Sequence, residues 1–257
     1  MFKYISCFES FCKVMYKIDI NCDLGEGMGN EEALMPFITS CNIACGGHAG
    51  DRKTMMRVVA LAAGNGVLVG AHPSYPDREH FGRKTLDIPE RELTKSILAQ
   101  ISALERILKL SNLPLNHIKP HGALYNDIAI NRRLAKVFLR AISGYREKTY
   151  LYVPYGSIIA EEALLNGFRI KYEAFMDRNY NSDLSLVPRS QENALIGDPE
   201  AVLGHLLPMV VREEVITITG KVVKLRADTF CIHGDTPAIL QILTYLSKEL
   251  PKHKISL

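Results

Sequence analysis

Ionisable side chains recur where short β-forming runs of this sequence end. Histidine, aspartate and glutamate can act as general acids, general bases or metal ligands, and lysine can neutralise an anionic oxygen. If the runs are parallel strands of a barrel, all their ends meet at one face, and these side chains converge on one site. The candidate catalytic or metal-binding residues are Asp23, Glu26, His48, His72, Lys119, His121, Glu173, Asp177 and His233.

The first of these runs places Asp19, Asn21 and Asp23 at alternate positions, so that their side chains share one face of a strand. Burying carboxylates side by side is costly unless cations or hydrogen-bond donors accompany them. The spacing therefore indicates either a functional site or a fully satisfied polar network inside the fold.

Histidines end four different predicted strands, at His48, His72, His121 and His233. A cluster of imidazoles and carboxylates can bind a divalent metal, supply acid and base groups, or do both. We take Asp23, His48 and His121 as the candidate metal ligands. Asp23, Glu26, His72, Lys119, Glu173, Asp177 and His233 are the candidates for catalysis, and Asp23, His48, His72 or His121 could be the base.

Further charged residues follow two other predicted strands. Lys119 lies in a strand–Pro–His turn, where it could oppose a carboxylate, carbonyl or phosphate oxygen, or extend into water. Glu173 and Asp177 flank another strand end, and Arg178 and Arg189 follow them. Either arginine could hold a substrate carboxylate through two hydrogen bonds, or simply pair with Asp177.

Several classes of protein are disfavoured by the sequence. It lacks the phosphate-loop pattern G-x-x-x-x-G-K-[ST], the nucleophile pattern G-x-S-x-G and the spacing of a dinucleotide fingerprint. Lys and Arg number 31 against 28 Asp and Glu and are scattered, which argues against a nucleic acid partner. Apolar runs fall well short of the ~20 residues that span a bilayer. Six cysteines without paired spacing favour reduced, packed thiols in a cytoplasmic protein.

Short strand-like runs alternate with longer helix-like runs, which is typical of an α/β fold built on a parallel sheet. The segment 215–227 differs, because two β-rich runs flank Thr219-Gly220-Lys221 and predict an inserted β-hairpin. Strands are expected at 17–22, 42–45, 67–71, 116–120, 150–154, 169–173 and 229–233. Helices are expected at 51–64, 89–109, 131–143, 156–166, 199–212 and 236–249.

The length of 257 residues suits one barrel domain, which we expect over residues 15–257. Residues 1–14 precede the alternating pattern and contain no uninterrupted apolar stretch of signal-peptide length. We therefore predict that translation begins at Met15 or that the extension is dispensable.

Seven blocks of the chain carry most of its polar and glycine-rich motifs. They are KIDINCDLGEG (17–27), SCNIACGGHAGD (40–51), VGAHPSYPDREHFGR (69–83), HIKPHGALYN (117–126), FMDRNY (175–180), LVPRSQENALI (186–196) and CIHGD (231–235). These blocks resemble those of the LamB/YcsF family, in the same order from about Met15 to the C-terminus. The resemblance implies a distorted seven-stranded (β/α) TIM-like barrel, similar to that of polysaccharide deacetylases.

The same resemblance implies an activity. The chain would be the A subunit of an ATP-dependent 5-oxoprolinase, which opens L-5-oxoproline to L-glutamate together with subunits B and C. The resemblance locates no ATP site, and it leaves open whether a divalent metal takes part. Two alternatives remain at this point: a stand-alone metal-dependent deacetylase or amidohydrolase, and a non-catalytic subunit that binds the substrate for its partners.

Overall fold

The computed structural model describes residues 16–257 of the chain. The predicted dispensable extension at 1–14 and the predicted start at Met15 lie outside the described residues. Within the part that is described, no helix has both the length and the apolar character needed to cross a bilayer.

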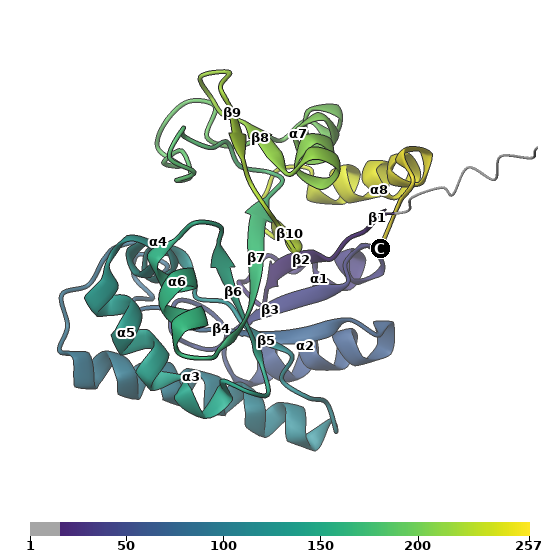
Figure 1. The fold of residues 1–257 in the computed structure, drawn as a ribbon. Helices are drawn as coiled ribbons and strands as arrows, with labels where there is room; N and C mark the ends of the chain where they lie inside the picture. Colours follow the sequence, from purple (N-terminus) through teal and green to yellow (C-terminus); the bar gives the residue numbers. More distant parts are fainter. Residues whose placement is uncertain (1–15) are drawn as a thin grey trace, which may run out of the picture.

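Seven parallel strands close into a barrel in the order β10-β2-β3-β4-β5-β6-β7, with the helices outside it (Figure 1). All seven predicted strands are present, and the predicted seven-stranded (β/α) barrel is confirmed. The strands are β2 (Ile20–Leu24), β3 (Ser40–Ala44), β4 (Leu68–His72), β5 (His117–Ile118), β6 (Tyr150–Pro154), β7 (Arg169–Phe175) and β10 (Thr229–His233).

Helices follow most of the strands, and several begin with the capping residues that the sequence indicates. The side chain of Asp51 accepts a hydrogen bond from the backbone N–H of Thr54, and Asp198 caps a helix that has Pro199 at its first position. Each predicted helical segment contains a helix, although the segment 131–143 ends earlier and α4 was not predicted. The helices are α1 (Glu31–Leu34), α2 (Arg52–Asn65), α3 (Glu90–Leu110), α4 (Gly122–Ile130), α5 (Arg132–Ala141), α6 (Ile158–Leu165), α7 (Pro199–Arg212) and α8 (Ile239–Glu249), with short 3-10 turns η1 (Met35–Phe37), η2 (Ser143–Tyr145) and η3 (Leu250–His253).

Two small additions lie outside the barrel. An antiparallel hairpin of β8 (Glu214–Ile216) and β9 (Val222–Lys224) packs beside α7, which confirms the hairpin predicted at 215–227. In Figure 1 this hairpin, α7 and α8 lie on the opposite side of the barrel from α3 and α5. Strand β1 (Tyr16–Lys17) pairs in parallel with β11 (Ile255–Ser256), which ties the start of the described chain to its C-terminus.

The inside of the barrel is lined by polar side chains at one level. Asp23, Asn42, Gly70 and His117 are register partners on four adjacent strands. The amide of Asn42 donates to Asp23 Oδ1 at 2.8 Å, and its oxygen lies 2.7 Å from Nε2 of His117. Glycine is required at position 70, because a Cβ there would lie 2.1 Å from the His117 ring. Alternate residues such as the buried Ile43 point the other way, towards the helices.

Candidate active site at the carboxyl ends of the barrel strands

The acidic residues at the two ends of β2 have different surroundings, a buried polar network at one end and a cavity at the other. At the first end, Asp19 accepts hydrogen bonds from Ser40 at 2.9 Å and from the hydroxyl of Tyr152 at 3.2 Å. At the other end, Asp23 lines a cavity of about 330 Å³. The alternate spacing of acids on this strand therefore builds a buried polar network at one level and a candidate site at the next.

Lys119 is a buried cation surrounded by acceptors. Its Nζ lies 2.9 Å from Asp23 Oδ1, 2.9 Å from Glu173 Oε1 and 3.0 Å from the sulfur of Cys231. Burial works against the charge of Lys119, but Asp23, Cys231 and Glu173 outweigh it and raise the pKa of the ammonium well above its ordinary value. Burial would likewise raise the pKa of Asp23, but His72 and Lys119 lower it well below its usual range. The pair is therefore ionised.

His233 and Asp177 form a second pair at the same end of the barrel. Nδ1 of His233 lies 3.0 Å from Asp177 Oδ2, and the backbone N–H of His233 donates to the same oxygen at 2.9 Å. Burial works to raise the pKa of Asp177, but His233 and the hydroxyl of Thr236 lower it to about 2. Asp177 is thus a buried carboxylate that fixes the orientation of an imidazole lining the cavity.

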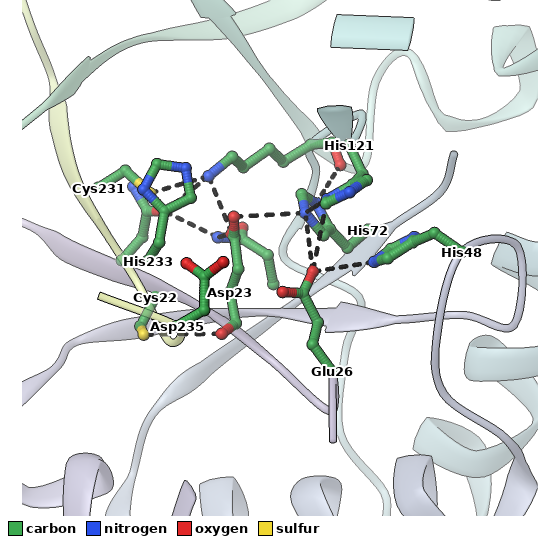
Figure 2. A network of polar contacts seen from close by, with 12 residues as sticks. Cys22, Asp23, Glu26, His48, His72, His121, Cys231, His233 and Asp235 are labelled. Atoms are coloured by element: carbon green, nitrogen blue, oxygen red, sulfur yellow. Dashed lines mark hydrogen bonds and ion pairs between the residues drawn. The ribbon is translucent and has the colours of Figure 1, made fainter. Parts of the chain in front are cut away.

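Three histidines and a glutamate form a tight cluster, which we call the histidine cluster: Glu26, His48, His72 and His121. Figure 2 shows it on one side of Asp23, with His233 and Cys231 on the other. Oε1 of Glu26 lies 2.9 Å from His48 Nε2, 3.4 Å from His121 Nδ1 and 3.8 Å from His72 Nε2.

Burial sets the ionisation of this cluster. It lowers the pKa of His48 and of His121 well below the ordinary value for histidine, and it raises the pKa of Glu26. The ring planes of His48 and His121 stack with centroids 3.6 Å apart. Such a set of imidazole and carboxylate atoms could hold a divalent metal ion.

The cavity lies at the carboxyl ends of the strands, where the sequence predicts a site, and it brings together most of the predicted residues. Of these, Glu173, Asp177 and His48 do not line it, although each contacts a residue that does. The predicted metal set of Asp23, His48 and His121 is divided, because Asp23 groups with Cys231 and His233 instead. The predicted residues on the cavity wall are Asp23, Glu26, His72, Lys119, His121, Arg178, Arg189 and His233.

Three arginines line this cavity, and they differ in their hydrogen-bond partners. Arg83 and Arg189 both bind the carboxylate of Asp235, at 2.7 Å and 2.9 Å. The guanidinium of Arg178 instead donates to the backbone carbonyls of Val187 and Ala194, rather than to the neighbouring Asp177. Arg189 uses both terminal nitrogens on Asp235, whereas Arg83 uses one, so Arg83 is the best placed of the three to take an anionic ligand.

Some cavity residues were not recognised as site residues from the sequence. The cavity is also lined by Arg83, Tyr125 and Phe175, and the side-chain amide of Asn42 donates a hydrogen bond to Asp23. Arg83 and Tyr125 stand inside the blocks 69–83 and 117–126, but neither residue type nor spacing sets them apart. For Asn42 a signal existed, since a polar residue on the next predicted strand can pair with the polar face of β2.

A closed (β/α) barrel with its ionisable residues gathered at the carboxyl ends of the strands is the architecture on which barrel enzymes build their sites. The profile of the LamB/YcsF family matches residues 18–257. This protein belongs to the LamB/YcsF family.

Named relatives and a solved structure agree with that assignment. The 5-oxoprolinase A subunit of Symbiobacterium thermophilum is 40% identical over 245 residues, covering 93% of this chain and 94% of its own length. The protein of the same name from Pyrococcus abyssi is 41% identical over 244 residues, covering 93% of this chain and 96% of its own. The lactam utilization protein from Thermus thermophilus superimposes with a TM-score of 0.86 at 35% identity, covering 94% of this chain and 98% of that one.

Proposed function

We propose that this chain is the A subunit of an ATP-dependent 5-oxoprolinase and opens L-5-oxoproline to L-glutamate together with subunits B and C. The names of its relatives support the substrate class. The observation that carries the chemistry is that His233, which Asp177 orients, lines the same cavity as the ionised Asp23. That cavity, of about 330 Å³, has the size of a small-molecule site.

The role of ATP follows from the stability of the substrate. An unstrained five-membered lactam resists hydrolysis because its amide is stabilised by resonance. Transfer of the γ-phosphoryl group of ATP to the lactam oxygen gives ADP and leaves a ring carbon that is a better electrophile. Water adds to this carbon, the C–N bond breaks as the nitrogen gains a proton, and a second water hydrolyses the resulting acyl phosphate to glutamate and phosphate.

His233 is the residue we assign to proton transfer. Asp177 accepts a hydrogen bond from Nδ1–H of this imidazole and stabilises the imidazolium that forms when His233 takes a proton from water. Lys119 has a different task. Its ammonium donates hydrogen bonds to Asp23 and Cys231 and forms an ion pair with Glu173, so it holds Asp23 in its ionised form instead of binding the substrate.

We assign the binding of the substrate's anionic groups to the arginines of the cavity wall. Arg83 and Arg189 share Asp235 as a partner, which positions both guanidinium groups on the cavity wall. A guanidinium can bind a carboxylate or a phosphoryl group through two parallel hydrogen bonds. Since the sequence has no phosphate-loop pattern, we assign the nucleotide contacts to the partner subunits, which would also close the site against water.

The test compares the purified chain with the complex reconstituted from subunits B and C of the same source, measuring glutamate and ADP together. We expect coupled turnover only in the complex, and a loss of ~10²-fold or more with His233→Gln, as is typical of a general base. His253→Gln, at an exposed position, is the control. Full turnover by the chain alone would contradict the subunit model, and unchanged turnover with His233→Gln would remove the assigned base.

One observation favours a second candidate function. Three of the four residues of the histidine cluster line the same cavity, and the cluster resembles the donor sets of metal-dependent hydrolases, so a stand-alone amidohydrolase is the second candidate. The two functions differ in a simple way. The stand-alone enzyme would release product without ATP and would lose activity to a chelator.

A further inference from the structure

Two imidazoles of the histidine cluster face each other in an arrangement that neutral rings cannot satisfy. Nδ1 of His72 lies 2.8 Å from the backbone carbonyl of Lys119, and Nε2 of His121 lies 3.0 Å from the carbonyl of Phe81. A carbonyl oxygen only accepts, so both of these nitrogens carry the proton. The remaining nitrogens, His72 Nε2 and His121 Nδ1, lie 2.9 Å apart and present lone pairs to each other. A cation or an additional proton must lie between them.

The surrounding donors have the spacing of a metal site. With metal–ligand bonds of 2.0–2.2 Å, the ligands of a tetrahedral ion lie roughly 3.3–3.6 Å apart. Oε1 of Glu26 lies near that separation from His121 Nδ1, at 3.4 Å, and from His72 Nε2, at 3.8 Å, whereas its 2.9 Å contact with His48 Nε2 is a hydrogen bond that an ion would replace. One donor atom from each of the four residues lies within 4.8 Å of all the others.

The outer contacts of the two facing rings also suit a metal. A histidine that binds a metal usually donates its other N–H to a carboxylate or a backbone carbonyl, which fixes the tautomer and the ring orientation. The carbonyls of Lys119 and Phe81 do this for His72 and His121. Nδ1 of His48 has no hydrogen-bond partner within residues 16–257, so His48 is the least firmly oriented of the three.

We propose that Glu26, His48, His72 and His121 form a binding site for one divalent transition-metal ion. Three imidazoles and one carboxylate favour zinc or a similar first-row ion over magnesium or calcium, which prefer all-oxygen ligands. Because Glu26, His72 and His121 also line the cavity, the ion stands at its wall. The site does not depend on the proposed reaction, since metal binding is measured without substrate, ATP or partner subunits.

The experiment uses the whole chain, freed of metal with a chelator and then dialysed. Zinc is titrated by calorimetry, bound metal is counted by mass spectrometry, and the visible spectrum of bound Co²⁺ reports the coordination. We expect one equivalent of zinc, with magnesium binding far more weakly. Glu26→Gln and His121→Ala should lower the affinity for zinc by more than the ~10–100-fold typical of losing an outer partner, and His48→Ala by less than either.

His253→Ala is the matched control, because it removes an exposed imidazole far along the chain and should leave zinc affinity unchanged. Circular dichroism and thermal melting of each metal-free variant separate loss of binding from loss of folding. Wild-type chain that takes up no zinc would overturn the proposal whatever the variants do, and would mean that a proton is shared between His72 and His121. Equal zinc binding by wild type, Glu26→Gln and His121→Ala would overturn it as well.

Discussion

Replacing Lys119 by methionine tests whether one buried cation holds the carboxylates of the site in place. Methionine has a similar length and no charge, so the change removes the ammonium with little change in volume. Lys119 is 2% exposed and lies 2.9 Å from both Asp23 and Glu173. The variant leaves these two acids buried without their common cation.

The size of the effect follows from this geometry. Removing one partner of a buried ion pair typically costs about 3–5 kcal/mol, because the remaining charge is no longer compensated. Asp23 keeps contacts with Asn42 and His72, whereas neither oxygen of Glu173 has a hydrogen-bond donor within residues 16–257. Most of the loss should therefore come from Glu173. The double variant Lys119→Met/Glu173→Gln should recover at least ~1 kcal/mol, which is a typical coupling between residues in contact.

The assay is urea unfolding followed by circular dichroism, applied to wild type, both single variants and the double variant. Lys95→Met, at an exposed position on α3, is the control and should change the free energy of unfolding by no more than ~0.5 kcal/mol. A loss below ~1 kcal/mol for Lys119→Met would refute the assignment of Lys119 as the shared counter-ion. A double variant less stable than Lys119→Met would refute the conclusion that most of the loss comes from the unpaired charge of Glu173.

Three further predictions concern packing, acid stability and substrate binding. Gly70→Ala should lower the free energy of unfolding by about 1–3 kcal/mol in urea, because its Cβ would lie 2.1 Å from the ring of His117. The control, Gly64→Ala in α2, has open space around the new Cβ and should raise the free energy of unfolding by up to ~1 kcal/mol. Burial lowers the pKa of His205 to about 4, so below pH of about 6.5 the unfolded chain binds a proton at His205 that the folded chain does not. The free energy of unfolding should therefore drop between pH 6 and 5 by about 1 kcal/mol more in wild type than in His205→Gln. An equal dependence of the free energy of unfolding on pH in the two proteins would contradict this. Arg83→Lys should raise KM for 5-oxoproline in the reconstituted complex roughly tenfold with a smaller change in kcat, because lysine cannot form two parallel hydrogen bonds. An unchanged KM would exclude this arginine from substrate binding.

The strands and the barrel could be predicted because they depend on local pattern. Each β-rich run alternates with a helix-forming run, and parallel strands joined by helices have few ways to close. Helix α4 escaped prediction because Pro120, His121 and Gly122 together are typical of a turn. Gly122 does take a left-handed conformation, with φ of 57°, but the chain then continues into a helix. Asn131 starts the next helix by accepting from the backbone N–H of Leu134.

The location of the site could also be predicted, whereas its internal pairing could not. Topology alone puts the carboxyl ends of all seven barrel strands at one face. Which nitrogen of His72 meets which nitrogen of His121 depends on two backbone carbonyls, one of them at Phe81 in a loop. The sequence pattern contains no information on such carbonyl positions, so it does not indicate that Glu26 shares a cluster with His48, His72 and His121.

Stability and chemistry share the same groups in this barrel. Asp23 contacts Lys119, Asn42 and His72, so it joins the buried ion pair, the polar network of the barrel and the histidine cluster. A change at Asp23 must therefore disturb all three, even if Asp23 never touches a substrate. Loss of activity with Asp23→Asn would not by itself show a catalytic role. The side chain of His233 lies near Asp23, but within residues 16–257 its hydrogen bonds go to Asp177 and to no member of these three groups. The effect of His233→Gln on turnover, measured at equal folded fraction, therefore distinguishes catalysis from support of the fold better than a change at Asp23 does.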